Sequence, residues 1–278
     1  MNKRHAAAAA TAATLSLTLA ACSSEPSEGS STSALTHIHG LGLAGGQLYI
    51  ATHEGVYSPG TNGKPVLVGT SKDDFMGFTV ARGTTFYASG HPSQGGNKGL
   101  IVSTDAGKTW SSLSLSGQSD FHALDYVDGS LYAYDATNGL LRTSRDGRTW
   151  KSGATLQALD IAVNPSDPAL VLATTEGGVA RSTDGGRTFL RSQPPVMTFL
   201  SWKAKDALYG IDISGGLNRS SDSGATWKKV SSVPGGQPQA LTAVNAEHVL
   251  VASQKGVYES KDGGKTFTRR MTVAGGDG

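Results

Sequence analysis

The side chains of this sequence best suited to chemistry are histidines, carboxylates and a methionine that occur in three short stretches. The stretches read "HIH" at residues 37–39, "DFM" at 74–76 and "DFH" at 120–122, and two further histidines follow in "ATHEG" (His53) and "SGHP" (His91). Neutral imidazole nitrogen binds copper, zinc, iron or nickel, and a thioether is a soft ligand that suits Cu(I). These residues could therefore hold a transition metal if the fold brings them together.

A repeated stretch of about eight residues shows how the chain is organised. "STDAGKTW" at 103–110 recurs as "SRDGRTW", "STDGGRTF", "SSDSGATW" and "SKDGGKTF", and "SPGTNGKP" at 58–65 is a degenerate further copy. The aspartates of the five clear copies follow one another at intervals of 38 to 41 residues: Asp105, Asp146, Asp184, Asp222 and Asp262. A fixed period of this length is typical of a propeller or solenoid.

The repeated stretches resemble Asp-boxes, also called BNR repeats, of sialidase-like and other β-propellers. The resemblance implies that each box joins the third and fourth strands of a blade, at its outer edge, and that its last aromatic residue packs under the hairpin. The five aspartates are therefore expected to be structural, with side chains that fold back on the turn. The whole chain is similar to bacterial Asp-box lipoproteins labelled glycosyl hydrolases or sialidase-like proteins, but a label based on the repeat does not determine function.

Each period otherwise reads as short alternating strands, and the 37 glycines and the low charged fraction of 17% favour a turn-rich all-β protein. Six such blocks fit between residue 36 and the C-terminus, the last three beginning near Leu156, Met197 and Gln239. We therefore predict an all-β fold, a β-propeller of six four-stranded blades. Seven blades and the manner of ring closure stay open.

Alignment of the blades assigns the three histidine stretches to the innermost strands of blades 1 to 3, which line the central channel. Because strand side chains alternate, the first and third residues of each stretch share a face. His53 and His91 follow the second strands, at the face where the first strands begin, whereas blades 4 to 6 have no histidine at the inner position. We predict a metal site at the channel rim formed by His37, His39, His53, Met76, His91 and His122, with Asp74 and Asp120 as ligands or polar support.

Blade 2 has a longer connection between its second and third strands, "GHPSQGGNKG" at 90–99. Rim loops of this composition often carry function, so this loop is a candidate lid or recognition element beside the histidines.

Three functions stay open. The first is the binding of a transition metal, for which copper is favoured because of Met76 and zinc is the alternative. A glycosyl hydrolase would use the carboxylates Asp74, Asp120 and Glu54. A protein-interaction platform without catalysis would resemble the propellers of photosystem assembly factors and sortilin-type receptors. A sialidase mechanism is disfavoured because it needs three arginines in the channel, and only Arg82, expected in a turn, lies away from the boxes and outer strands. Whether the protein is an enzyme is left undecided.

The N-terminus reads as an export signal. A basic start, "MNKR", precedes an apolar run and "LAAC", in which Cys22 is the only cysteine of the chain. This ending resembles a bacterial lipobox, so residues 1–21 are expected to be a lipoprotein signal peptide, with an ordinary secretory signal as the alternative. Cys22 would then carry the lipid, residues 22–35 would form a flexible linker, and residues 36–278 the propeller. The expected location is the outer face of the bacterial cell membrane.

The net charge expected for the mature chain gives little information about its partners. Loss of residues 1–21 removes Lys3 and Arg4 from 24 basic side chains, which leaves 22 basic and 22 acidic ones. A net charge of zero gives no indication of nucleic acid as a partner, and no nucleotide cofactor is expected. We expect a monomer that contacts the membrane through its lipid, with a protein or glycan partner left open.

Overall fold

The computed structural model describes residue 35 and residues 37–273. The predicted signal peptide, Cys22 and all of the predicted linker before Leu35 lie outside these residues. Within the described part, no helix is long and apolar enough to cross a bilayer.

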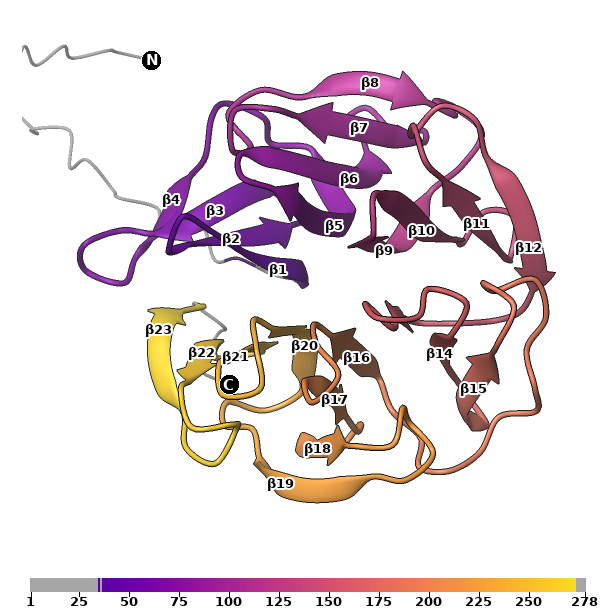
Figure 1. Ribbon diagram of the computed structural model, residues 1–278. Coiled ribbons are helices and arrows are strands. Elements are labelled where there is room, and N and C mark those ends of the chain that lie inside the picture. The colour runs from indigo at the N-terminus through magenta and orange to yellow at the C-terminus, as the bar shows by residue number, and fades with distance from the viewer. Residues whose placement is uncertain (1–34, 36, 274–278) are drawn as a thin grey trace, which may run out of the picture. The chain divides into compact units, whose positions relative to one another are not determined.

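The described residues form 23 strands in six antiparallel sheets, which are arranged as blades around a central channel (Figure 1). Blade 1 contains β1 (Ile38–Ala44), β2 (Gln47–Thr52), β3 (Gly55–Pro59) and β4 (Pro65–Leu67). Blade 2 contains β5 (Asp74–Arg82), β6 (Thr85–His91), β7 (Leu100–Ser103) and β8 (Ser111–Ser114). Blade 3 contains β9 (Phe121–Val127), β10 (Ser130–Asp135), β11 (Leu140–Ser144) and β12 (Lys151–Thr155). Blade 4 contains β13 (Ile161–Val163), β14 (Val171–Thr175) and β15 (Gly178–Ser182). Blade 5 contains β16 (Phe199–Trp202), β17 (Leu208–Ile211), β18 (Gly216–Ser220) and β19 (Lys228–Ser232). Blade 6 contains β20 (Pro238–Ala243), β21 (Val249–Ser253), β22 (Gly256–Ser260) and β23 (Thr268–Thr272).

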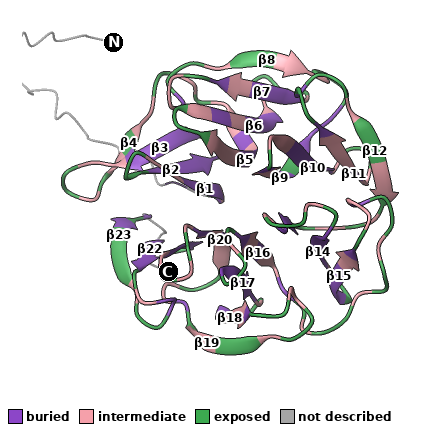
Figure 2. Cartoon of the chain, in the orientation of Figure 1, coloured by how far each residue is buried: buried purple, intermediate pink, exposed green. Residues whose placement is uncertain are grey.

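The prediction of an all-β propeller with six blades is confirmed. Strands consecutive in sequence are neighbours in every sheet, and the first strand of each blade lies innermost. The outermost strands β8, β12, β19 and β23 are the exposed ones, whereas second strands are almost wholly buried (Figure 2).

Blade 4 departs from the regular pattern. Its outer position is occupied by a segment that is not a continuous strand, in which the Leu190 amide donates to the Arg181 carbonyl (2.9 Å) and the Gln193 amide to the Val179 carbonyl (3.0 Å). Its inner strand begins at Ile161, five residues later than the predicted start near Leu156. Just before it the Asp160 amide donates to the Thr174 hydroxyl (2.8 Å), while the Thr174 amide donates to the Asp160 carbonyl (2.9 Å), so the pairing there is irregular.

The ring closes by packing of side chains between blades 1 and 6. One core cluster contains Leu41 and Ile50 of blade 1 together with Leu250 and Val257 of blade 6. Leu35, assigned above to the linker, is only 2% exposed and belongs to the same cluster. Thr242 also donates its hydroxyl hydrogen to the Leu41 carbonyl (2.8 Å) across this junction. Closure therefore needs no exchange of strands between the ends of the ring.

The Asp-box turns join third and fourth strands, as their resemblance implies. In the first box the Ser103 hydroxyl donates to Asp105 Oδ1 (2.8 Å), and the Thr109 amide donates to the same oxygen (2.9 Å). Bonds from the Thr109 hydroxyl and amide lower the pKa of Asp105 to about 2. The Trp110 ring packs on Phe75, 5.1 Å away between ring centroids. The box aspartates are thus fully engaged in their own turns, away from the channel.

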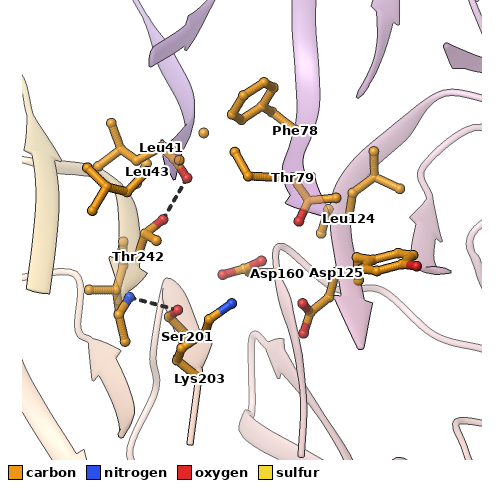
Figure 3. A pocket seen from close by; sticks show the side chains of 18 of the residues that line it. Leu41, Leu43, Phe78, Thr79, Leu124, Asp125, Asp160, Ser201, Lys203 and Thr242 are labelled. Atoms are coloured by element: carbon orange, nitrogen blue, oxygen red, sulfur yellow. Dashed lines mark hydrogen bonds between the residues drawn. The ribbon is translucent and has the colours of Figure 1, made fainter. Parts of the chain in front are cut away.

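Side chains of the inner strands also hold neighbouring blades together. Asp125 Oδ2 accepts the Val163 amide of blade 4 (3.0 Å), and Asp160 Oδ2 accepts the Leu200 amide of blade 5 (2.8 Å). The Ser201 hydroxyl accepts an amide of blade 6 in the same way. These groups converge on the channel cavity, which has a volume of about 380 Å³ (Figure 3). Burial raises the pKa of Asp125 to about 6 and that of Asp160 to about 7.

Candidate metal centre

Bulges near the start of the inner strands direct the histidines. In β1, Ile38 pairs with Thr52 and Gly40 with Ala51, so His39 is an extra residue without a partner in the ladder. In β9 the extra residue is His122, and in β5 two residues, Met76 and Gly77, occupy the place of one. A bulge redirects its side chain, so simple alternation, on which the shared face was predicted, is not the reason that these residues approach one another.

The first half-site contains His39, His53 and Asp74. The Nε2 atoms of His39 and His53 are 3.3 Å apart, and His53 Nδ1 lies 2.9 Å from Asp74 Oδ2. Candidate ligand atoms of these three residues all lie within 4.8 Å of one another. His37 is close as well, with a ring centroid 5.0 Å from that of His53. Blade 1 thus supplies three imidazoles and blade 2 one carboxylate.

The protonation of His39 follows from its surroundings. Burial, and next the charges of the neighbouring His53 and His37, lower its pKa to about 3. His39 is therefore neutral at neutral pH, and a neutral imidazole has a lone pair that a metal ion can accept.

The second half-site contains His91, Asp120 and His122. Asp120 Oδ2 lies 2.6 Å from His122 Nε2 and 3.2 Å from His91 Nε2. The hydrogen bond to Asp120 raises the pKa of His122. Asp120 is 4% exposed, and its Oδ1 is buried without a hydrogen-bond partner, as is Oδ1 of Asp74. Gly90, the residue before His91, approaches the backbone of Asp74 so closely that a Cβ there would lie 2.0 Å from the Asp74 carbonyl oxygen. Its φ of +145° also favours glycine.

The rim loop of blade 2 is attached to His91 of the second half-site and to Asp73, the neighbour of Asp74. The Gly96 carbonyl lies 2.8 Å from His91 Nδ1, and Asp73, which precedes Asp74, accepts from the Lys98 ammonium at 2.8 Å. Neither contact was predicted. The Gly96 contact is made by a backbone oxygen, which every residue has, so the sequence gives no signal for it. Asp73 and Lys98 are residues of a common charge pair, and nothing in the sequence connects them with a functional site.

Met76 and Glu54 are the remaining residues predicted for the site. Met76 is half-buried in the β5 bulge, and Glu54 follows His53, with its amide bonded to the Thr52 hydroxyl (3.0 Å). His248, a histidine outside both half-sites, directly precedes β21, and its Nε2 is 2.7 Å from Glu259 Oε1. In blade 6, Gln239 is the extra residue of a bulge, as His39 is in blade 1, and in blade 5 Thr198 directly precedes β16. The prediction that Gln157 occupies the inner position of blade 4 was wrong, because this residue lies four positions before the inner strand β13.

The expected position of Arg82 was wrong. It is the last residue of the inner strand β5, rather than part of a turn, because β5 extends to the hairpin. Its guanidinium lies 5.9 Å from the centroid of the Tyr126 ring. Arg82 is the single arginine lining the described channel cavity, so the three arginines of a sialidase site are not assembled there.

Comparison with known proteins supports the repeat and the fold. The model of the BNR/Asp-box repeat matches residues 101–112. A GH74 enzyme of Niastella koreensis is 18% identical, with a TM-score of 0.62, over 86% of this chain and 46% of the enzyme. Virginiamycin B lyase from Staphylococcus aureus is 14% identical, with a TM-score of 0.56, over 82% of this chain and 85% of the lyase.

A chain of a nidogen/laminin complex is 10% identical, with a TM-score of 0.63, over 80% of this chain and 91% of that one. No curated protein matches this sequence. This chain spans less than half the length of the GH74 enzymes that it matches. At these identities the likeness concerns the fold alone, so repeat and fold together identify the chain as an Asp-box β-propeller.

Proposed function

We propose that this propeller binds a transition metal ion at its channel rim, through the Nε2 atoms of His39 and His53. The observation that carries the proposal is their separation of 3.3 Å. Two nitrogens at 2.0–2.1 Å from one Zn²⁺ ion and 3.3 Å apart subtend an angle of about 107°, close to the tetrahedral value. The spacing therefore matches two ligands of a single ion.

The hydrogen bond of His53 supports the same function. Its Nδ1 donates to Asp74 Oδ2 at 2.9 Å, so the lone pair of Nε2 faces His39. Metal-binding histidines usually donate their other ring N–H to a carboxylate or a carbonyl, which fixes the tautomer and the ring orientation. Asp74 is therefore assigned to polar support of His53 rather than to direct ligation.

Copper is the metal that we favour, and zinc is the alternative. His37, with a ring centroid 5.0 Å from that of His53 and 6.2 Å from that of His39, would complete a set of three imidazoles if its ring turned toward them, and Met76 on the adjacent inner strand would add a soft sulfur. Three imidazoles with a thioether suit copper in both common oxidation states, whereas imidazoles with a carboxylate also suit zinc. When bound, the ion would act as a Lewis acid or a redox centre at the mouth of the channel.

The location in the cell follows from the N-terminal sequence. With residues 1–21 cleaved and Cys22 lipidated, the propeller would be tethered outside the cell membrane and would bind metal there. In this proposal the protein works as a monomer, because the two half-sites are built within one ring.

Glycoside hydrolysis is less well supported. Two of the structural neighbours are named as GH74 enzymes, but only the fold is shared at this identity. Asp74 and Asp120, the carboxylates that a hydrolase would use, are both bonded to imidazoles. No contact at the rim specifically favours an interaction platform.

Calorimetric titration of the metal-free full chain with Cu²⁺ and with Zn²⁺ tests the proposal, followed by elemental analysis after gel filtration. We expect retained metal in the wild type and its loss from the first half-site in His39→Gln with His53→Gln. His248→Gln is the matched control, because this histidine is bonded to Glu259 outside the rim. A wild-type chain that retains neither metal would refute the proposal.

A further inference from the structure

The rim repeats its arrangement of histidine and aspartate one blade further on. His53, just after the second strand of blade 1, faces Asp74 at the start of the first strand of blade 2. His91, at the end of the second strand of blade 2, faces Asp120 immediately before the first strand of blade 3, but through Nε2, whereas His53 faces Asp74 through Nδ1. The bulge histidines His39 and His122 add a second imidazole to each pair.

The ring of His91 is oriented as a metal ligand would be. Its Nδ1 lies 2.8 Å from the Gly96 carbonyl oxygen, which can only accept, so this nitrogen carries hydrogen. In the neutral imidazole Nε2 then has a lone pair, and it lies 3.2 Å from a carboxylate oxygen of Asp120. Two lone pairs at this distance repel each other unless a cation, either a proton or a metal ion, lies between them.

The charge of Asp120 is compensated only at one oxygen, where Oδ2 accepts from His122 Nε2 at 2.6 Å. The side chain is almost wholly buried, Oδ2 is shared by two imidazoles, and Oδ1 has no hydrogen-bond partner. Burial of a carboxylate is costly unless the charge is paired or coordinates a metal. A dication held by this carboxylate would complete that compensation.

We propose that His91, Asp120 and His122 bind a second divalent ion, zinc or copper(II), so that the rim is a two-ion centre. This inference takes the class of ion from the proposed function, but it uses different residues. The separation of 3.2 Å between His91 Nε2 and Asp120 Oδ2 is close to the roughly 3.3 Å expected between two ligands of one tetrahedral zinc ion, whereas the 2.6 Å between His122 Nε2 and Oδ2 is the length of a hydrogen bond. Unlike those of the first half-site, the candidate ligand atoms of His91, Asp120 and His122 do not all lie within 4.8 Å of one another, so an ion would bind here only after the two rings move and the hydrogen bond from His122 to Asp120 is displaced.

The two half-sites are neighbours. His39 and His122 both line the channel cavity. The inner strand between them is β5, whose bulge carries Met76. Two ions bound at these places would therefore sense each other.

The experiment counts ions in the purified, metal-free full chain, loaded with Zn²⁺ and examined by native mass spectrometry. We expect two ions in the wild type and in the control His248→Gln. One ion is expected in His91→Gln with His122→Gln, and one in His39→Gln with His53→Gln. Asp120→Asn, which keeps both imidazoles, should weaken the second ion at least tenfold. Circular dichroism establishes that each variant is folded before its ions are counted.

The outcomes separate the two proposals. One ion in the wild type, lost with His39 and His53, would overturn the two-ion centre and leave the proposed function standing. Two ions retained without His91 and His122 would also overturn it, because the second ion would then lie elsewhere. No ion in the wild type would end both proposals. With two equivalents of Cu²⁺, electron paramagnetic resonance should show coupled spins, and two magnetically isolated signals would contradict a shared centre.

Discussion

Replacement of Asp74 by asparagine tests the first half-site most directly. In the wild type, His53 Nδ1 lies 2.9 Å from Asp74 Oδ2. Asp74→Asn keeps the size of the side chain and an oxygen that can accept this hydrogen bond, but it removes the negative charge. The variant therefore isolates what the carboxylate charge contributes to an ion bound on the other side of the imidazole ring.

The expected magnitude follows from the distance across the ring. The path from Asp74 Oδ2 through the imidazole to an ion on Nε2 is about 7 Å, the observed 2.9 Å plus the width of the ring and a bond of about 2 Å. A unit negative charge and a dication at that distance attract each other by about 1 kcal/mol in a water-like dielectric and by about 5 kcal/mol at an effective dielectric constant of 20. Because the Asp74 side chain is 21% exposed at an open rim, we expect the lower part of this range. This corresponds to a ten- to hundred-fold loss of affinity, the usual effect of removing such a partner.

The assay is competition for Zn²⁺ against a chromophoric chelator at constant ionic strength. Asp73→Asn is the matched control, since Asp73 adjoins Asp74 but is bonded to Lys98 and the loop rather than to an imidazole. We expect the affinity of Asp73→Asn to stay within about threefold of wild type. Equal losses in both variants, or none in Asp74→Asn, would refute the assignment of Asp74 to support of His53.

Three further predictions concern the fold that positions the site. Asp160 has a pKa of about 7 in the folded protein and an ordinary value of 3.8 when unfolded, so the folded state holds an extra proton between these values and stability falls as pH rises through this window. Urea unfolding should show that Asp160→Asn removes up to about 4 kcal/mol of this fall between pH 4 and pH 8, and an unchanged slope would contradict the buried ionisation. Leu35→Ala should destabilise the junction of blades 1 and 6 by about 2 kcal/mol in the same measurement, whereas a change near zero would mean that Leu35 does not contribute to closure. Gly90→Ala should cost about 1–3 kcal/mol and reduce zinc binding at His91, because the residue has a φ of +145° and its Cβ would meet the Asp74 carbonyl; unaltered stability and stoichiometry would argue against this close approach.

The fold could be predicted well because its signals are local. Each Asp-box is a self-contained turn in which Ser103, Asp105 and Thr109 bond to one another, so a short stretch of sequence determines its own structure. Repetition at nearly constant spacing then determined the number of blades. The prediction was poorest in blade 4, where the inner strand starts late and the Asp160 amide bonds to the Thr174 side chain beside the backbone bonds of Leu159 and Asp160 to Thr174.

The candidate site could be predicted in composition but not in arrangement. Alignment of the blades assigned the histidines to the rim, yet the bulges that aim His39 and His122 arise from register and have no mark in the sequence. The partition into two half-sites depends on contacts between separate blades. The Gly96 carbonyl reaches His91 through the fold of a single loop, and the neutral state of His39 follows from its burial beside His53 and His37.

The sequence by itself therefore determined which residues this protein contributes to chemistry, the repeat that carries them and the six-bladed ring, because turns and alternating strands depend on neighbours along the chain. Only the tertiary structure decided how the ring closes, which imidazole faces which carboxylate, and that Asp120 is buried with an oxygen left without a partner. These features depend on distances between blades some 40 residues apart in sequence, and such distances are set by packing of the whole ring.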